Sequence, residues 1–314
     1  MYYQKLVKKK PMIQKIKFIC LFVAISGFSQ SKGDQYKNEG DLEKAIIAYK
    51  SAFNENKSDA KNVYNLASAY ALTYQIDSAY HYLNISLKND SSLWALADND
   101  LLPLTSDKRW SAIQKQQLEK FQQKNGQLKE PGYAIQLLKL IQKDQALDYQ
   151  LDMAKRYFMK NGKIPHWYYP IAQQKKEIGA ANFSKIEALI AQYGWPKYSS
   201  VGKLAADAPL IIINHLETEE MRIKYLPKIK DACLQKEGSC MEYAKIQDRI
   251  LVNTGKLQIY GMQFRYNNER KLEPFPIKDP EYVDQKRKAI GLVPIKQYLK
   301  RKINYDWTIQ QKTK

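Results

Sequence analysis

The chain has 314 residues, and its 51 Lys and Arg against 32 Asp and Glu give a formal net charge of +19. The basic residues are scattered, without the run of arginines and aromatics that forms a nucleic-acid platform, so we expect no nucleic-acid partner. None of the three histidines lies at metal-ligand spacing from another histidine or from a cysteine. We therefore expect no metal site, and since no motif with a known chemical mechanism occurs, we expect no cofactor.

The N-terminus has the pattern of an export signal. Six lysines and no acidic residue accompany the eleven-residue apolar run Phe18–Phe28. Small residues at Gly27 and Ser29 predict cleavage after Ser29, so residues 1–29 are the signal and the mature chain begins at Gln30. An uncleaved anchor is the alternative, although this run has only about half of the roughly 20 residues that span a bilayer. Cys20 lacks a lipoprotein box, and no later segment is long enough to cross a membrane, so we expect a periplasmic or secreted protein.

The positive charge is unevenly distributed. Without the signal, 45 basic residues face 32 acidic ones, and residues 30–125 hold twelve of each sign. The whole excess therefore falls in residues 126–314, where 33 basic residues face 20 acidic ones. The positive charge of this half could bind an anionic envelope ligand such as a glycan or a lipid head group. The alternative is a lysine-rich surface that only keeps the protein in solution.

Small and aromatic positions recur at a period of 34 residues. The positions are Gly33, Tyr36, Ala45, Tyr49 and Ala52, followed by Ala67, Tyr70, Ala79, Leu83 and Ser86. Over residues 31–91 this pattern resembles the tetratricopeptide repeat, whose helix pairs need a small residue at a close crossing, and Leu93–Ile113 resembles its capping helices. The resemblance implies a concave face for a protein or peptide partner, with a spacer as the alternative. Roughly three repeats are needed for a stable array, so we expect this unit to be stabilised by packing against the rest of the chain.

The polar stretch from Gln122 to Gly132 contains two breakers and predicts a boundary between a repeat unit at 30–125 and a C-terminal domain at 126–314. Hydrophobic periodicity, caps and breakers predict a mostly α fold with a small β-hairpin, of the α+β kind. The expected helices are Tyr133–Met159 as one or two, Asn182–Tyr193, one from Ser200 that Pro209 kinks or Asp207 divides, Glu217–Cys233, Cys240–Asn253, one after Asp279–Pro280, and Pro294–Ile303. The expected strands are Lys256–Tyr266 and Lys271–Ile277, joined by a turn at Asn267–Asn268.

Two shorter segments carry chemical information. Cys233 and Cys240 are seven apart, so in an oxidising compartment they can close a small disulfide loop, with free thiols as the alternative. The aromatic segment Ile164–Pro170 has prolines near both edges and predicts a loop that either stacks on sugar rings or lies over the core.

A group of polar residues set in apolar surroundings marks the candidate site. His215 ends the apolar stripe of its helix, and Asp248 lies on the inner face of another, so we expect both to point into a shared core. A buried aspartate needs a partner, and His215, Arg249 and Arg287 are the candidates. Such a pair is either catalytic or a satisfied interaction that fixes helix packing.

Ligand-binding candidates follow on the predicted hairpin. Gln258 and Tyr260 share a strand face, and Gly261 permits a bulge that turns Gln263 toward them. Two amides and a phenol can hydrogen-bond a polyhydroxylated or amide-bearing ligand, and they can equally tie the hairpin to the helices. Trp195 completes the set of ligand-binding candidates.

The order of these motifs resembles a bacterial domain family of unknown function over residues 131–303. The matching motifs are Gly194-Trp195-Pro196, Val201-Gly202, His215, Tyr225-Leu226-Pro227, Tyr243-Ala244, Asp248-Arg249, Gln258, Tyr260-Gly261, Gln263, Asp284, Arg287, Gly291-Leu292 and Tyr298. The chain departs from the pattern at Asn214-His215-Leu216 and Met262. Asp144-Gln145 matches a family dipeptide, but the arginine expected shortly after it is absent. The resemblance implies no activity.

Three functions fit these observations. The first is an exported binding or interaction protein of the cell envelope. The second is a hydrolase of an envelope polymer or peptide, with His215 as general base, Asp248 orienting it, and Arg249 or the glutamines holding an oxyanion. Because no serine or cysteine nucleophile stands out, this enzyme would use an activated water. The third is a degenerate domain kept as a scaffold.

Overall fold

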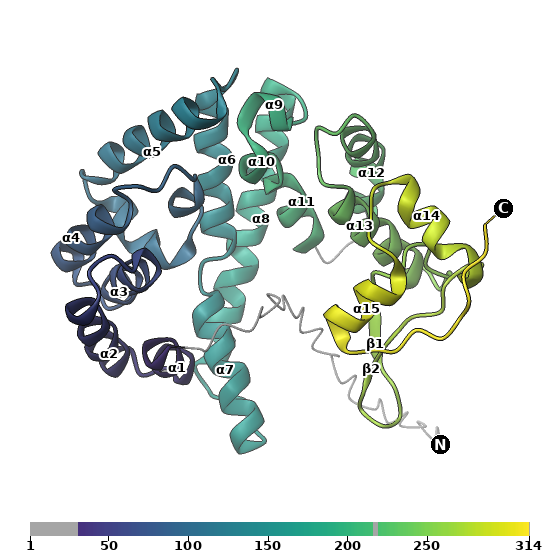
Figure 1. Cartoon of the computed structure of the whole chain (residues 1–314), viewed down its shortest axis with the longest axis horizontal. Helices are drawn as coiled ribbons and strands as arrows, with labels where there is room; N and C mark the ends of the chain where they lie inside the picture. The colour runs from purple at the N-terminus through teal and green to yellow at the C-terminus, as the bar shows by residue number, and fades with distance from the viewer. Residues whose placement is uncertain (1–30, 216–218, 314) are drawn as a thin grey trace, which may run out of the picture.

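The computed structural model describes residues 31–215 and 219–313, and the predicted signal with its cleavage point after Ser29 lies outside these residues. The chain is mostly helical with one two-stranded antiparallel hairpin, which confirms the predicted fold class (Figure 1).

Two helical hairpins open the described chain. They are formed by α1 (Lys32–Glu39), α2 (Leu42–Glu55), α3 (Ala60–Leu72) and α4 (Ile76–Ser86). The side chains of Ser31, Asp41 and Asp59 begin α1, α2 and α3 by accepting a backbone N–H three residues on.

A small residue faces a large one inside the first helical hairpin. Gly33 lies so close to the Tyr49 ring that a Cβ atom on it would approach the ring to 2.3 Å. At the equivalent positions 34 residues later, Ala67 and Leu83 are completely buried. The helical hairpins are thus compatible with the predicted repeats.

The repeat helices share a core with the C-terminal helices. After η1 (Trp94–Leu96), η2 (Asn99–Ser106) and α5 (Trp110–Asn125), the chain enters α6 (Pro131–Asp144). Gln142 of α6 donates a hydrogen bond to the carbonyl of Asp98 at 2.9 Å, and Tyr149 donates to the carbonyl of Lys37 at 3.0 Å. One continuous cluster of buried residues runs from Ala45 to Ile250. The predicted boundary at 125/126 is therefore a loop between helices and not a gap in the core.

The remaining elements form the right-hand part of Figure 1 and the long helices at its centre. They are α7 (Asp148–Asn161), α8 (Tyr168–Tyr193), α9 (Tyr198–Val201), α10 (Lys203–Ala206), α11 (Ala208–His215), α12 (Glu219–Leu234), α13 (Cys240–Asn253), β1 (Phe264–Tyr266), β2 (Leu272–Pro274), η3 (Pro280–Tyr282), α14 (Val283–Ala289) and α15 (Ile295–Ile303). A second, smaller core joins the hairpin to α14 and α15 around Met262, Val283 and Leu299.

Four predicted elements differ in the structure. The helix expected at Asn182–Tyr193 already begins at Tyr168. The helix expected from Ser200 is divided twice, because Gly202 with φ +81° separates α9 from α10, and α11 begins after Asp207, as in the predicted alternative. The expected strands shrink to three residues each, with Gln258 bridging Ile277 outside the paired register. The aromatic segment is a loop only as far as Trp167, because Pro170 lies in the first turn of α8, where a helix tolerates proline.

The cysteine pair forms a disulfide. Cys233 at the end of α12 is bonded to Cys240 at the start of α13, with a Cα–Cα distance of 4.7 Å. The bond closes the short loop between the two helices. Within residues 31–215 and 219–313, no helix combines the length and apolar character required to cross a bilayer.

The shared core gives a testable consequence for the repeat helices. A fragment of residues 30–125 loses the apolar surface of α6 and the hydrogen bonds of Gln142 and Tyr149. We expect it to unfold without a cooperative transition in thermal circular dichroism, whereas the chain from Gln30 to Lys314 melts cooperatively. A sharp melt of the fragment alone would contradict this dependence.

Candidate functional site

The carboxylate of Asp248 accepts hydrogen bonds from the backbone of a loop. Asp248 lies on α13 and is completely buried. Its Oδ1 accepts hydrogen bonds from the backbone N–H groups of Ile259 at 2.7 Å and Tyr260 at 3.1 Å. Its Oδ2 accepts from Tyr260 at 3.0 Å and from Met262 at 2.9 Å. Burial raises the pKa of Asp248 to about 6, although these bonds and the charge of Arg287 act in the opposite direction.

The same loop is held from its other side by Arg287 of α14. This completely buried arginine donates through Nη1 to the carbonyl of Tyr260 and through Nε to the carbonyl of Val293 at 2.7 Å. Gly261 has φ +74°, and a Cβ atom there would lie 2.5 Å from Cδ1 of Ile295, so only glycine fits. Burial lowers the pKa of Arg287.

Both candidate glutamines are engaged by backbone groups. The amide of Gln258 donates to the carbonyls of Gln263 at 3.1 Å and Phe275 at 2.7 Å, and accepts from the N–H of Gln263 at 2.9 Å. Gln263 in turn donates to the carbonyl of Lys245 at 2.9 Å. Gln258 is completely buried and joins the two sides of the hairpin to each other, whereas Gln263 joins the hairpin to α13. A ligand-binding role stays a prediction for the half-buried Tyr260, Gln263 and Trp195.

The partner of His215 is Asp144, which the sequence reasoning did not select. His215 Nδ1 lies 2.7 Å from Asp144 Oδ2, which joins the end of α11 to the end of α6. The side chain of Asp144 is 3 % exposed and that of His215 is 31 % exposed. The predicted pairing of His215 with Asp248 is wrong, because backbone N–H groups occupy both oxygens of Asp248. The only signal for Asp144 was its place in the family dipeptide Asp144-Gln145.

A lysine and a second carboxylate adjoin this pair. Lys175 of α8 donates to the backbone carbonyl of Asp144 and forms an ion pair with Asp148 at 2.6 Å. Burial raises the pKa of Asp148, and the charges of Lys175 and His215 lower it. Four titratable groups therefore meet where α6, α7, α8 and α11 approach one another (Figure 1).

Two guanidinium groups meet at the same end of α11. Arg249 Nη1 and Arg222 Nη2 donate to the carbonyl of Asn214, the residue before His215, at 2.9 and 3.1 Å. Both arginines therefore lie at the carbonyl end of the described part of α11, where the helix dipole favours cations. Arg222 also pairs with Glu219 at 2.6 Å. Burial lowers the pKa of Arg249, and the like charge of Arg222 lowers it further.

The candidate aromatic residues lie in other contacts. Trp195 packs against Tyr225 of α12 with ring centroids 5.9 Å apart, and Tyr260 packs against Tyr243 of α13 at 6.0 Å. Burial raises the pKa of Tyr260. The structure thus brings His215 and Arg249 together at one end of α11. The other candidates support the hairpin: Asp248, Gln258, Tyr260 and Gln263.

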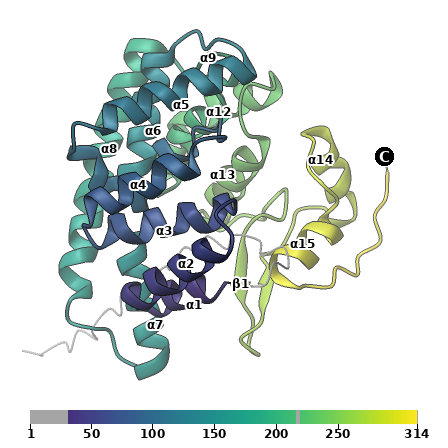
Figure 2. The ribbon, with the colours of Figure 1, turned by 60° about the vertical axis from the view of Figure 1, so that its left-hand side comes forward.

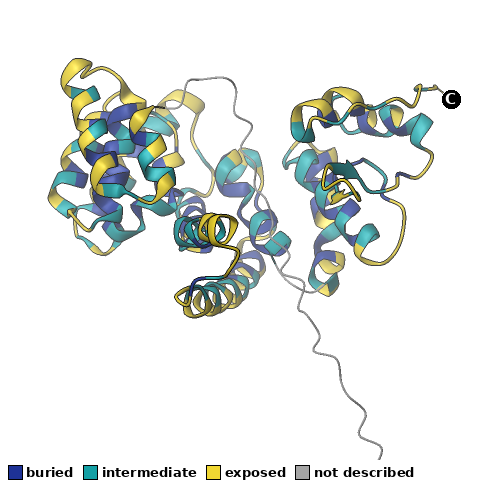
Figure 3. Ribbon diagram, turned by 90° about the horizontal axis from the view of Figure 1, so that it is seen from below, coloured by how far each residue is buried: buried dark blue, intermediate teal, exposed yellow. Residues whose placement is uncertain are grey.

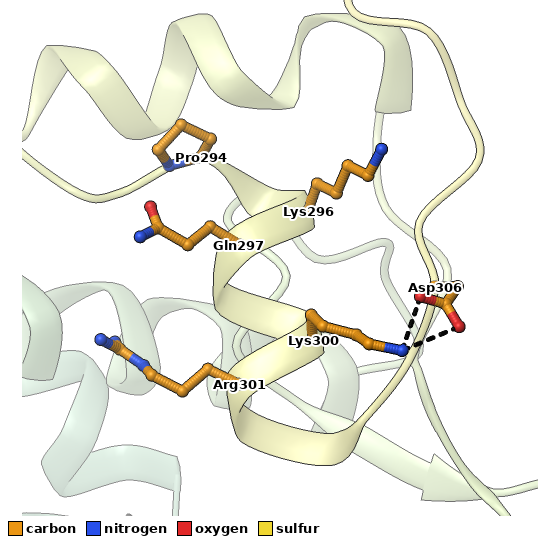
Figure 4. A pocket seen from close by; sticks show the side chains of 6 residues that line it. All are labelled: Pro294, Lys296, Gln297, Lys300, Arg301 and Asp306. Carbon is orange, nitrogen blue, oxygen red and sulfur yellow. Dashed lines mark hydrogen bonds and ion pairs between the residues drawn. The ribbon is translucent and has the colours of Figure 1, made fainter. Parts of the chain in front are cut away.

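A separate open pocket of about 710 Å³ lies along α15. It is lined by Pro294, Lys296, Gln297, Lys300, Arg301 and Asp306. Lys300 is paired with Asp306 at 2.8 Å, and Lys296 and Arg301 extend to opposite sides of the helix (Figure 4). These cations do not converge on one point, so the pocket lacks the geometry of a specific anion site. Within the described ranges, no group of three or more His, Cys, Asp and Glu residues is placed to hold a metal ion.

Comparison with protein families gives one match. The family of unknown function DUF6624 matches residues 131–310, which contain every candidate site residue. Neither the curated proteins nor the solved structures contain a match.

Because Asp248 supports the loop, we expect the isosteric substitution Asp248→Asn to lower the stability of the fold. Asp248→Asn replaces an accepting oxygen with an NH₂ group that faces backbone N–H donors. We expect a loss of about 1–3 kcal/mol in the free energy of unfolding, measured in urea. Asp306→Asn, which removes only a surface ion pair, should cost less than about 1 kcal/mol.

The raised pKa of Asp248 adds a pH dependence to this comparison. The folded state keeps the proton up to about pH 6, whereas the ordinary value is 3.8. The stability from this group is therefore fully present below pH about 4 and is lost as the pH rises through about 6. The stability difference between the wild type and Asp248→Asn should shrink over this window. An equal difference at pH 4 and pH 7 would show that the carboxyl does not titrate in this way.

Proposed function

The chain belongs to the DUF6624 family, and we propose that it is an exported cell-envelope protein that binds an anionic polar ligand beside His215. The observation that carries the proposal is the meeting of Arg222 and Arg249 on one carbonyl, at the helix end that also bears His215. The candidate ligands are carboxylate- or phosphate-bearing components of the envelope.

The energetics of the arginine pair favour an anion. Burial, first, and the like charge of Arg222 lower the pKa of Arg249, and the charges of Glu219 and Glu242 only partly oppose this. Glu219 pairs with Arg222. Arg249 uses one of its five donors for the carbonyl of Asn214, which leaves donors for a second acceptor. A bound carboxylate or phosphate would offset both penalties through charge-assisted hydrogen bonds.

Export is supported by the N-terminal lysines and apolar run, and by the disulfide between Cys233 and Cys240, a bond that persists in oxidising compartments. The helical hairpins α1–α4 offer a second surface, for a protein or peptide partner. We therefore propose a periplasmic or secreted location.

Anion binding is tested by calorimetric titration with inorganic phosphate, citrate and N-acetylmuramic acid. Arg249→Gln keeps a donor for the carbonyl of Asn214 and removes the charge, so we expect the affinity for the bound anion to fall about tenfold. The matched control is Arg265→Gln, which removes an arginine from the hairpin surface and should leave the affinity unchanged. No binding of any probe, or equal affinities of wild type and Arg249→Gln, would overturn the proposal.

A second function, hydrolysis of an envelope polymer or peptide, is favoured by the bond between His215 and Asp144. A buried carboxylate on Nδ1 orients the ring, and a ring that is 31 % exposed can take a proton from water through Nε2. Asp144 here takes the orienting role that the sequence suggested for Asp248. Arg249 would hold the developing oxyanion.

If the protein is a hydrolase, its rate should depend on both His215 and Asp144. With peptidoglycan fragments as substrate, His215→Ala should abolish product formation, and Asp144→Asn should lower the rate at least about tenfold. His81→Ala, at an exposed histidine on α4, is the matched control and should leave the rate unchanged. Turnover that survives His215→Ala would exclude this mechanism, and the absence of turnover in the wild type favours the binding function.

A further inference from the structure

The end of the α7–α8 helical hairpin exposes an unusual number of large apolar side chains. It comprises residues 156–169, from the last turns of α7 to the first turn of α8, and is called the α7–α8 tip below. Its exposed members are Tyr157 (38 %), Phe158 (41 %), Met159 (77 %), Trp167 (41 %) and Tyr169 (61 %). Several exposed large apolar side chains gathered in one short segment indicate an interaction site.

The α7–α8 tip projects from the body of the molecule. In Figures 1 and 2 it lies beyond the lower end of the repeat helices, and Figure 3 views this end from below. The beginning of α7 is packed on α1 through Tyr149 and Met153, whereas its last turns are exposed. Ile164 and Pro165 are the less exposed residues of the connecting turn. A projecting end of this kind can reach a flat surface.

The charge of the tip is entirely positive. Arg156, Lys160 and Lys163 are exposed, and no acidic residue occurs from Met153 to Lys176. Within the described parts of the chain, none of these three cations takes part in an ion pair. The exposed apolar residues therefore share their segment with cations and with no carboxylate.

This composition selects one kind of partner. Trp and Tyr prefer the interface between lipid tails and water, and Lys and Arg next to them pair with anionic head groups. A protein partner of matching chemistry would need a concave acidic surface with an apolar centre. The projecting position of the tip and its positive charge favour a flat anionic surface.

We propose that the α7–α8 tip docks the protein on the surface of a bilayer that contains anionic lipids. Phe158, Met159 and Trp167 enter the head-group region, while Arg156, Lys160 and Lys163 pair with lipid phosphates. Docking of this kind is peripheral and requires no helix that crosses the membrane. It does not rest on the ligand site at the end of α11, since the two share no residue.

The test uses the chain from Gln30, because the predicted signal would itself bind lipid. Co-sedimentation is measured with vesicles of phosphatidylglycerol and phosphatidylcholine in equal parts, and with vesicles of phosphatidylcholine alone. We expect binding to the anionic vesicles, and at least about tenfold weaker binding for the triple variant Arg156→Gln, Lys160→Gln, Lys163→Gln, since each cation contributes about fivefold.

A matched control removes three cations from the rival basic surface, with Lys296→Gln, Lys300→Gln and Arg301→Gln on α15. This control should keep the binding within about twofold of the wild type, because its cations lie outside the tip. Equal losses in the two triple variants would mean that net charge alone drives binding, and would overturn the proposal. Absence of binding to anionic vesicles would overturn it too.

The insertion of the apolar residues has its own readout. Trp167 is one of five tryptophans, and we expect anionic vesicles to shift the emission to shorter wavelength in the wild type but not in Trp167→Phe. A shift that persists in Trp167→Phe would contradict insertion of the tip. If Met159→Ser instead converts a dimer into a monomer in analytical ultracentrifugation, the patch is covered by a second copy and the lipid proposal fails. Far-ultraviolet circular dichroism confirms that each variant is folded.

Discussion

The C-terminal part of the molecule depends on one buried carboxylate. Asp248 offers two oxygens to the backbone N–H groups of three residues in a loop that has almost no regular structure of its own. These N–H groups would otherwise be buried without partners, at a cost of about 1–3 kcal/mol each. With the loop fixed, Arg287 can reach the carbonyl of Tyr260, and Gly261 can approach Ile295. The hairpin, α14 and α15 are thus assembled around a charge on α13.

The arrangement separates two sets of polar residues that look alike in sequence. One set surrounds Asp248, and its side chains form hydrogen bonds with backbone groups that position the hairpin. The other set, at the end of α11, pairs side chain with side chain and retains exposed surface on His215. Groups that keep both a fixed partner and contact with solvent are the ones able to exchange protons or bind ligands.

The sequence predicted what is decided locally. The helices from Cys240 to Asn253 and from Pro294 to Ile303 follow from periodicity and capping, and the short spacing of Cys233 and Cys240 anticipated their bond. The site was predicted in part, because the pairing of His215 with a residue 71 positions earlier depends on how α6 and α11 cross. The strands were predicted too long, because alternation continues through residues 259–262 while Asp248 pulls their backbone out of the ladder.

The disulfide has a consequence for the arginine pair. Arg222 belongs to α12 and Arg249 to α13, and the bond between Cys233 and Cys240 closes the connection between these two helices. The spacing of the two guanidiniums is therefore linked to the oxidation of a thiol pair on the same helices. With Cys233 and Cys240 reduced, α12 and α13 would pack without their covalent link. The thiol–disulfide state of this cysteine pair then affects how firmly the two positive charges are held relative to each other.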